Sequence, residues 1–161
     1  SRRLRAFADT PTETMYAEVQ DLLTLFGIPF YVSPNEAEAQ CASMEMEGLV
    51  DGVVTDDNDV FLFGARRVMR NMFDEKKFVE VYEMGAVEEK LGLNRERLIL
   101  LAMMLGSDYT EGIKGVGVVN AMEILGAYGG SMDGLRRFRA FIDSPDEELL
   151  RVLRGYGEGD G

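Results

Sequence analysis

The stretch from Gly52 to Gly64, GVVTDDNDVFLFG, constrains the fold more than any other part of the chain. Val53, Val54 and Thr55 predict the end of a buried strand, because β-branched residues suit a covered, pleated surface and the flanking glycines mark its limits. A run of acids follows directly. In open α/β sheets, ligands bind beyond the carboxyl ends of the strands. The stretch therefore predicts an α/β fold with an acidic site at that edge.

The acids of this stretch differ in the direction they are expected to face. Asp57 and Asp59 are two residues apart, so in extended backbone they project to the same side, while Asp56 points elsewhere. Two neighbouring carboxylates repel each other and are best tolerated when a hard divalent cation such as Mg²⁺ neutralises them. The alternative is a solvated acidic loop in an acidic protein.

The amino-acid composition excludes catalytic mechanisms that need histidine or paired cysteines within this sequence. The chain has no histidine and one cysteine, Cys41, which excludes zinc-hydroxide chemistry, a Ser-His dyad and an internal disulfide within this sequence. A single cysteine suits a reducing compartment, and we interpret Cys41 and the ten methionines as packing residues. Any catalysis must therefore depend on carboxylates.

The net charge of −12 argues at first sight against a nucleic-acid partner. Basic residues are clustered, however, and two bound divalent cations would add about four positive charges. The basic clusters are Arg66, Arg67, Arg70, Lys76 and Lys77, and later Arg136, Arg137 and Arg139. No apolar run approaches the roughly 20 residues of a membrane span, so a membrane is not an expected partner.

The 161 residues, 46% of them hydrophobic, predict a compact fold with a real core. The chain opens with Ser-Arg-Arg rather than Met, which predicts a piece of a larger protein whose residues 1–11 are a disordered or cut end.

The first part of the chain alternates helices and strands. Helical spacing predicts a helix from Thr12 to Phe26, then a strand over residues 28–32. Ser33 is the expected cap of a helix from Pro34 to about residue 47. This helix would carry Glu36 and Glu38 in its first turn, where acids also commonly complement the helix dipole without any further role.

Residues 51–55, 68–72 and 78–82 are predicted strands, and residues 84–91 and 94–105 are predicted helices, the last a core helix. This alternation predicts a three-layer α/β unit over residues 12–105 with mainly parallel strands.

After residue 105 the sequence becomes helical and rich in glycine. A turn over residues 106–110 contains Asp108, and a three-glycine loop then precedes a helix over residues 118–125. Glycines let a backbone approach a phosphate, and the amides of a helix start face the anion. An ordinary turn between helices is the alternative. Further helices are predicted over residues 132–142 and 145–153, which places a helical region at 106–154 and a flexible tail at 155–161.

Five acids stand at strand ends, helix entries or turns: Glu36, Glu38, Asp57, Asp59 and Asp108. If they converge at one edge of an α/β sheet, they fit a two-metal site that hydrolyses phosphodiesters.

The order EAEAQCA, TDDNDVFLFGA, MLGSDYTEGIKGVG and AMEIL resembles the internal nuclease region of the flap endonuclease superfamily. The resemblance runs from about Glu18 to Leu125. NEAEAQCA, LFGARRVMRNMF and KFVEVYEM are most similar to the XPG (xeroderma pigmentosum group G) type, as is Val118-Val119 after the glycine loop, where other relatives usually have Pro-Lys.

This resemblance implies a PIN-like or resolvase-like nuclease core followed by a helix-two-turns-helix element that binds DNA. It implies that the five acids are metal ligands for two Mg²⁺ ions, with Mn²⁺ as a substitute and K⁺ at the glycine hairpin. The residues implied to contact duplex DNA are Gly112, Lys114, Gly115 and Gly117.

The implied activity is structure-specific incision at junctions of single- and double-stranded DNA, such as bubbles, splayed arms and flaps, in nucleotide excision repair. Other repair proteins and a nuclear location follow from the same resemblance. The family's N-terminal region, which supplies further ligands, does not precede Ser1, so we expect this segment alone to be weakly active or inactive. Two alternatives stay open: a DNA-binding or scaffolding module with a vestigial site, and a flap endonuclease or 5′ exonuclease relative.

Overall fold

The computed structural model describes residues 11–75 and 77–143. The chain divides into two compact units, Ser1–Ala37 and Glu38–Gly161, and each is described by itself. The predicted cut end, apart from residue 11, lies outside the described residues, as do the predicted helix over 145–153 and the tail. None of the helices in the described ranges has the length and apolar character needed to cross a membrane.

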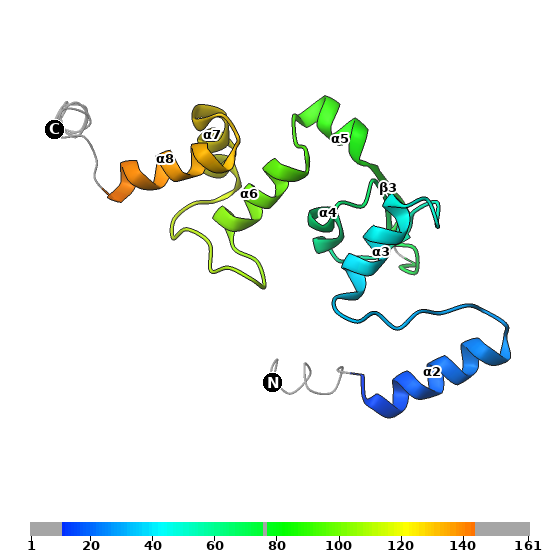
Figure 1. Cartoon of the computed structure of the whole chain (residues 1–161). Helices are drawn as coiled ribbons and strands as arrows, with labels where there is room; N and C mark the ends of the chain where they lie inside the picture. Colours follow the sequence, from blue (N-terminus) through cyan, green and yellow to red (C-terminus); the bar gives the residue numbers. More distant parts are fainter. Residues whose placement is uncertain (1–10, 76, 144–161) are drawn as a thin grey trace, which may run out of the picture. The chain divides into compact units, whose positions relative to one another are not determined.

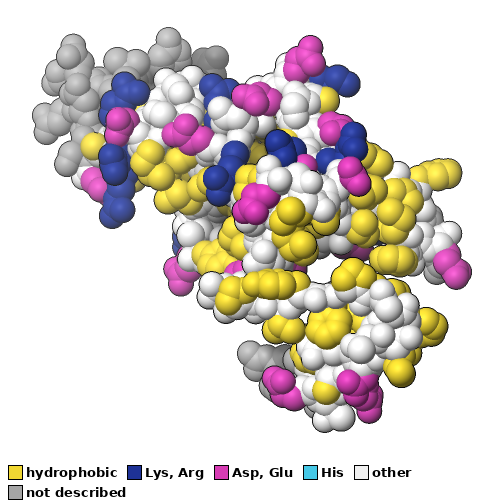
Figure 2. Space-filling view, turned by 45° about the vertical axis from the view of Figure 1, so that its right-hand side comes forward, with side chains coloured by type: hydrophobic (Ala, Val, Ile, Leu, Met, Phe, Trp, Pro, Cys, Tyr) yellow, Lys and Arg dark blue, Asp and Glu magenta, His cyan; other side chains and the backbone are white. Residues whose placement is uncertain are grey.

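The first unit contains helix α2, Glu13–Leu25. Thr12 caps it, since its hydroxyl accepts a hydrogen bond from the backbone N–H of Met15 at 3.3 Å. Gly27, with φ of 66°, follows the helix end. None of the α2 residues is buried. Figure 2 shows many hydrophobic side chains exposed on the face it presents.

The strand predicted over residues 28–32 is wrong. This segment has no strand assignment, and Phe30, Tyr31 and Val32 are 45%, 65% and 65% exposed. A strand requires a neighbour that satisfies its backbone groups, and β-prone side chains alone do not supply one.

Helix α3, Ala37–Met46, begins later than predicted. Ser33 forms a turn instead of a helix cap: its hydroxyl accepts from the N–H of Asn35 and donates to the carbonyl of Glu36. Short polar side chains often compete with helix formation in this way. Glu36 therefore precedes the helix, whereas Glu38 lies in its first turn.

The sheet has three strands in the described part of the chain: β1 (Val53–Val54), β2 (Arg67–Arg70) and β3 (Glu80–Glu83), in that order. β1 and β2 are parallel, whereas β2 and β3 are antiparallel. The prediction of mainly parallel strands is therefore wrong for these strands. The short link over residues 71–79 reverses the chain, whereas a parallel connection needs a longer crossover.

The crossover between β1 and β2 contains helix α4, Asp59–Phe63. The helices that follow are α5 (Met84–Leu91), α6 (Arg95–Leu105), α7 (Val118–Tyr128) and α8 (Met132–Asp143). Their order along the chain can be followed by colour in Figure 1. All four agree with prediction to within a few residues.

Two hydrophobic cores lie in the second unit. The first joins α3, the sheet and α4 through Ala42, Val53, Val60, Ala65 and Val68. The second joins α6 and α7 through Leu100, Leu101, Met104, Ala121 and Leu125, which confirms α6 as a core helix. The domain boundary expected between residues 105 and 106 stays a prediction.

Cys41 is exposed in the structure, so its interpretation as a packing residue is wrong. The helical spacing of α3 puts Ala42, the next residue, on the buried face instead.

Candidate active site

The acidic loop between β1 and α4 is held by its own hydrogen bonds. The N–H of Asp57 donates to the hydroxyl of Thr55 at 3.1 Å, and the N–H of Asp59 donates to Oδ1 of Asp57 at 2.9 Å. Asp59 is the first residue of α4, so the two acids do not share the extended backbone that we expected. Both nevertheless line one pocket.

Asp56 faces a different partner, as predicted. Its Oδ1 accepts a hydrogen bond of 2.7 Å from the backbone N–H of Asn71, at the end of β2. The acidic loop is thereby attached to the neighbouring strand by a side chain that does not line the pocket.

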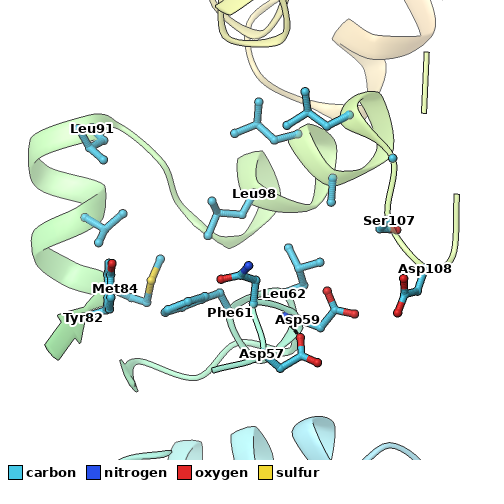
Figure 3. Close-up of a pocket in the computed structure, with 16 residues that line it drawn as sticks. Asp57, Asp59, Phe61, Leu62, Tyr82, Met84, Leu91, Leu98, Ser107 and Asp108 are labelled. Atoms are coloured by element: carbon cyan, nitrogen blue, oxygen red, sulfur yellow. Dashed lines mark hydrogen bonds between the residues drawn. The ribbon is translucent and has the colours of Figure 1, made fainter. Parts of the chain in front are cut away.

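The pocket in the second unit has a volume of about 620 Å³. Asp57, Asp59 and Asp108 lie at one end, and Tyr82, Met84 and Leu91 lie toward the other (Figure 3). The acids at this end come from a loop, a helix start and the turn after α6. Asp57 and Asp108 are exposed and Asp59 is half-buried, so a cation could reach this end of the pocket from solvent.

Aromatic packing builds part of the apolar wall. Phe61 and Tyr82 meet edge to face with ring centroids 5.6 Å apart. The Tyr82 hydroxyl donates to the Glu80 carboxylate at 2.8 Å, and this hydrogen bond, together with the negative charge of Glu80, raises the pKa of Tyr82 above its ordinary value. Tyr82 is therefore neutral where it borders the pocket.

The donors at the acidic end fit a hard divalent cation in kind, since all are carboxylate oxygens. In number they are not a complete shell: across residues 11–75 and 77–143, no group of three or more acidic, histidine or cysteine side chains is placed to hold a metal unaided. Mg²⁺ usually keeps several waters and takes one or two carboxylates, so a partial set is compatible with it.

The other two predicted ligands are Glu38 and Glu36. Glu38, half-buried in the first turn of α3, does not line the pocket. Glu36 belongs to the first unit and is described only within it. The structure thus brings together three of the five predicted acids around one pocket.

The glycine loop is anchored to the second core. The N–H of Ile113 donates to the carbonyl of Met104 at 2.7 Å, and Ile113 and Val116 pack against the core. Gly112 has φ of 73°, and a Cβ there would lie 2.5 Å from the backbone nitrogen of Gly106. Glycine is therefore required at this position by the fold itself.

Gly117 differs, because neither its backbone nor its surroundings require glycine. It is the N-cap of α7 with φ of −96°, and an added Cβ would meet nothing within 4 Å. Lys114 is exposed on the same loop, next to Gly115, whose φ is 84°. The start of α7 thus presents open backbone N–H groups, the arrangement that suits an anion.

A family model for the XPG I-region matches residues 27–108, which is about half of this chain. The chain belongs to the XPG I-region family. The match contains four of the five predicted metal ligands between its limits and ends on the fifth, Asp108.

Known proteins agree with this membership. DNA excision repair protein ERCC-5 of Mus musculus is 50% identical over 132 residues, covering 81% of this chain and 11% of that protein. The catalytic core of Rad2 in complex with DNA substrate superposes with a TM-score of 0.79 at 42% identity, covering 91% of this chain and 48% of that one. This chain thus spans about a tenth of the curated relative's length.

A more distant structure contains a metal. The Holliday junction-resolving enzyme GEN1, in complex with product DNA and a Mg²⁺ ion, has a TM-score of 0.67 and 30% identity, covering 83% of this chain and 35% of that one. These similarities place the XPG I-region chain among nuclease cores that combine α/β and helical elements.

Sequence reasoning missed one residue beside the acidic end of this XPG I-region pocket. Arg70 donates to Oδ1 of Asn58 and to the carbonyl of Asp56, both at 2.8 Å. No local signal in the sequence identifies this contact, because it depends on the pairing of β1 with β2, which brings the carboxyl ends of the two strands together.

Proposed function

We propose that this chain is part of a Mg²⁺-dependent, structure-specific DNA endonuclease of nucleotide excision repair, acting in the nucleus with other repair proteins. One observation carries the proposal: Asp57, Asp59 and Asp108, from separate parts of an XPG I-region chain, line the acidic end of one pocket. The excision-repair relative and the DNA-bound Rad2 core support the substrate class.

The pocket carboxylates are proposed to hold two Mg²⁺ ions, or Mn²⁺ in their place. Glu36 and Glu38 are proposed as further ligands only from the family resemblance. Bound there, the metal would supply an activated water and stabilise the departing oxygen of the phosphodiester. Asp57 and Asp59 would supply ligating oxygens from the acidic loop and the start of α4, and Phe61 and Leu62 line the adjoining apolar wall. The negative charge of these acids would offset the positive charge of the metals.

The glycine loop is proposed to hold the duplex next to this site, independently of base sequence. Gly112 and Gly115 shape the loop, Gly117 leaves space at the start of α7, and exposed Lys114 supplies positive charge toward a phosphate. A K⁺ ion at this hairpin would be held by backbone oxygens. The proposed substrates are junctions in bubble, splayed-arm or flap DNA.

The proposal is tested by incision of a bubble DNA by the intact protein during a Mg²⁺ titration. Asp57→Asn keeps the oxygen that accepts from the N–H of Asp59 but removes the charge. We expect incision by the wild type to require the metal and incision by this variant to fall by at least about 100-fold, while the fold persists. Glu111→Gln, an acid outside the pocket, is the matched control.

A second function is favoured by the incomplete ligand set in the described residues. In this alternative the chain is a DNA-binding or scaffolding module with a vestigial nuclease site. Binding of the bubble without incision at any Mg²⁺ concentration would support it. Comparison of bubbles, 5′ flaps and recessed ends would separate the proposed activity from that of a flap endonuclease or 5′ exonuclease.

A further inference from the structure

Arg70 connects β2 to the loop that carries the pocket acids. Its two terminal nitrogens donate separately, one to the side-chain oxygen of Asn58 and one to the backbone carbonyl of Asp56. These two residues flank Asp57. The guanidinium therefore grips the loop on both sides of a carboxylate that lines the pocket.

A second bond acts on the same loop from the next residue of the chain. Asn71 has a left-handed backbone, with φ of 57°, and its N–H donates to the Asp56 carboxylate at 2.7 Å. Such a conformation is uncommon outside glycine, although asparagine tolerates it better than most residues. Arg70 and Asn71 together attach the loop to the end of β2 by three hydrogen bonds.

The Arg70 side chain is not fully exposed to solvent. Arg70 is half-buried, and its Nε is buried without a hydrogen-bond partner among the described residues, so only the two terminal nitrogens bind the loop. Arg67, on the same strand, offers a contrast, since its exposed side chain pairs with Glu83 at 2.6 Å and does not touch the acidic loop.

We propose that Arg70 is a positioning residue, which fixes the loop from Asp56 to Asn58 so that Asp57 and Asp59 face the pocket in a geometry that binds a divalent cation. The inference rests on the proposed function. The hydrogen bonds of Arg70 go to the Asp56 carbonyl and the Asn58 side chain, and it acts on Asp57 and Asp59 through these two groups.

Charge alone would give the opposite effect. A guanidinium close to a cation site repels the cation, so neutralising Arg70 would tighten metal binding if its charge were all that mattered. A positioning role predicts weaker binding after the same change, because the loop loses its fixed shape. The two bonds also need the planar fork of arginine, which the single ammonium of lysine does not provide.

The test is a titration of Mn²⁺ followed by electron paramagnetic resonance, with the intact protein and without DNA. We expect Arg70→Gln to weaken Mn²⁺ binding about 10- to 100-fold, as loss of outer-shell partners of metal ligands commonly does. Arg70→Lys should restore the charge but not the affinity. Arg67→Gln, the matched control, should bind within about twofold of the wild type.

The folding of each variant and its affinity for DNA are measured alongside the Mn²⁺ titration. Each variant is checked by circular dichroism and thermal unfolding. Should Arg70→Gln fail to fold, Asn58→Ala removes the acceptor at the other end of one bond and is expected to weaken Mn²⁺ binding in the same direction. The affinity for bubble DNA in EDTA should be unchanged by Arg70→Gln beyond the effect of one charge.

Unchanged or tighter Mn²⁺ binding by Arg70→Gln overturns the inference. If that variant binds Mn²⁺ normally but loses affinity for DNA, Arg70 is a phosphate contact instead. If the wild type binds no Mn²⁺, the proposed function fails as well. If Asp57→Asn abolishes Mn²⁺ binding and Arg70→Gln does not alter it, only the role of Arg70 fails.

Discussion

Gly112 and Gly117 are glycines of the same loop, but the physical reason for a glycine differs between the two positions. Gly112 is enclosed by the backbone of Leu105 and Gly106 at positive φ, whereas Gly117 faces open space at a φ that any residue adopts. The first glycine serves the fold. The second is free to serve a ligand, and substitutions separate the two.

Gly112→Ala is expected to lower the free energy of unfolding by about 2 to 5 kcal/mol, from left-handed strain together with a clash against backbone that cannot move cheaply. Urea denaturation of the intact protein measures this. Gly115→Ala is the control, because its positive φ remains but its Cβ meets nothing within 4 Å. Equal losses for the two variants would contradict the assigned clash.

Gly117→Asp and Gly117→Asn are expected to fold normally, because both residues are good helix caps. The aspartate should weaken binding to duplex DNA well beyond the asparagine, since it places a negative charge where the phosphate is proposed to lie. Fluorescence anisotropy at two salt concentrations measures the difference. Equal affinities would remove Gly117 from the proposed interface.

Tyr82 has a raised pKa, relative to an ordinary value of 10.0, mainly through its hydrogen bond to Glu80. The folded state thus favours the neutral phenol. The stability gained is present below the unfolded pKa and is lost as pH rises through the folded pKa. Tyr82→Phe should therefore lower the midpoint of thermal unfolding at pH 8, and the difference from the wild type should shrink above pH 10. A constant difference would contradict this assignment.

At the scale of elements, a buried carboxylate joins α3 to β2. Glu45 is 6% exposed, and its Oε2 accepts from the backbone N–H of Arg66 at 3.0 Å. The Arg66 guanidinium returns a hydrogen bond to the carbonyls of Glu45 and Met46, the last residues of α3. These hydrogen bonds attach the end of α3 to the residue that precedes β2.

Glu45→Ala should cost about 1 to 3 kcal/mol, because it leaves the Arg66 N–H without its acceptor while the exposed guanidinium stays solvated. Glu45→Gln retains an oxygen at that position and should cost clearly less. Chemical denaturation at neutral pH compares them. Equal costs would mean that the carboxylate charge, not the hydrogen bond, is what matters.

Elements with strong local signals were predicted well. Helix α2 begins after Thr12, whose hydroxyl accepts from the N–H of Met15, and the richly apolar α6 is the core helix that its composition predicted. Where the outcome depends on a distant partner, local signals were insufficient. Residues 28–32 have strand-forming side chains but no neighbouring strand, and the turn at Ser33 delayed α3 and moved Glu36 out of it.

The same limit applies to the site. A pattern of acids identified Asp57, Asp59 and Asp108, since each stands at an element's end. It could not show that Arg70 would reach the acidic loop, because that contact depends on the pairing of β1 with β2. Nor could it show which acids would line one pocket, because this depends on how α4 meets α6.

At the scale of the whole molecule, the net charge of −12 opposes association with DNA. Part of this negative charge lies in the pocket, on Asp57, Asp59 and Asp108. Asp57→Asn with Asp59→Asn should therefore bind bubble DNA more tightly than the wild type in EDTA, because two negative charges are gone. In Ca²⁺ the order should reverse, since only the wild type recruits the cation.

The checking measurement is a pair of binding isotherms at fixed ionic strength, one in EDTA and one in Ca²⁺. The same affinity shift on adding Ca²⁺ in both proteins would contradict the idea that the pocket acids recruit the ion. Glu88→Gln with Glu89→Gln, two acids of α5 outside the pocket, controls for net charge alone.

The acids of the pocket are attached to two different cores: Asp57 and Asp59 stand beside the first, and Asp108 follows the helix that builds the second. A hydrogen bond of 2.7 Å from Arg95 to the carbonyl of Leu62 ties the start of α6 to α4. The distance from Asp57 and Asp59 to Asp108 therefore depends on how α4 meets α6, and this hydrogen bond lies at that contact. A small ion and a large ion require different distances between their ligands, so if the pocket holds a metal as proposed, loosening this hydrogen bond is expected to change the relative affinity for magnesium and calcium.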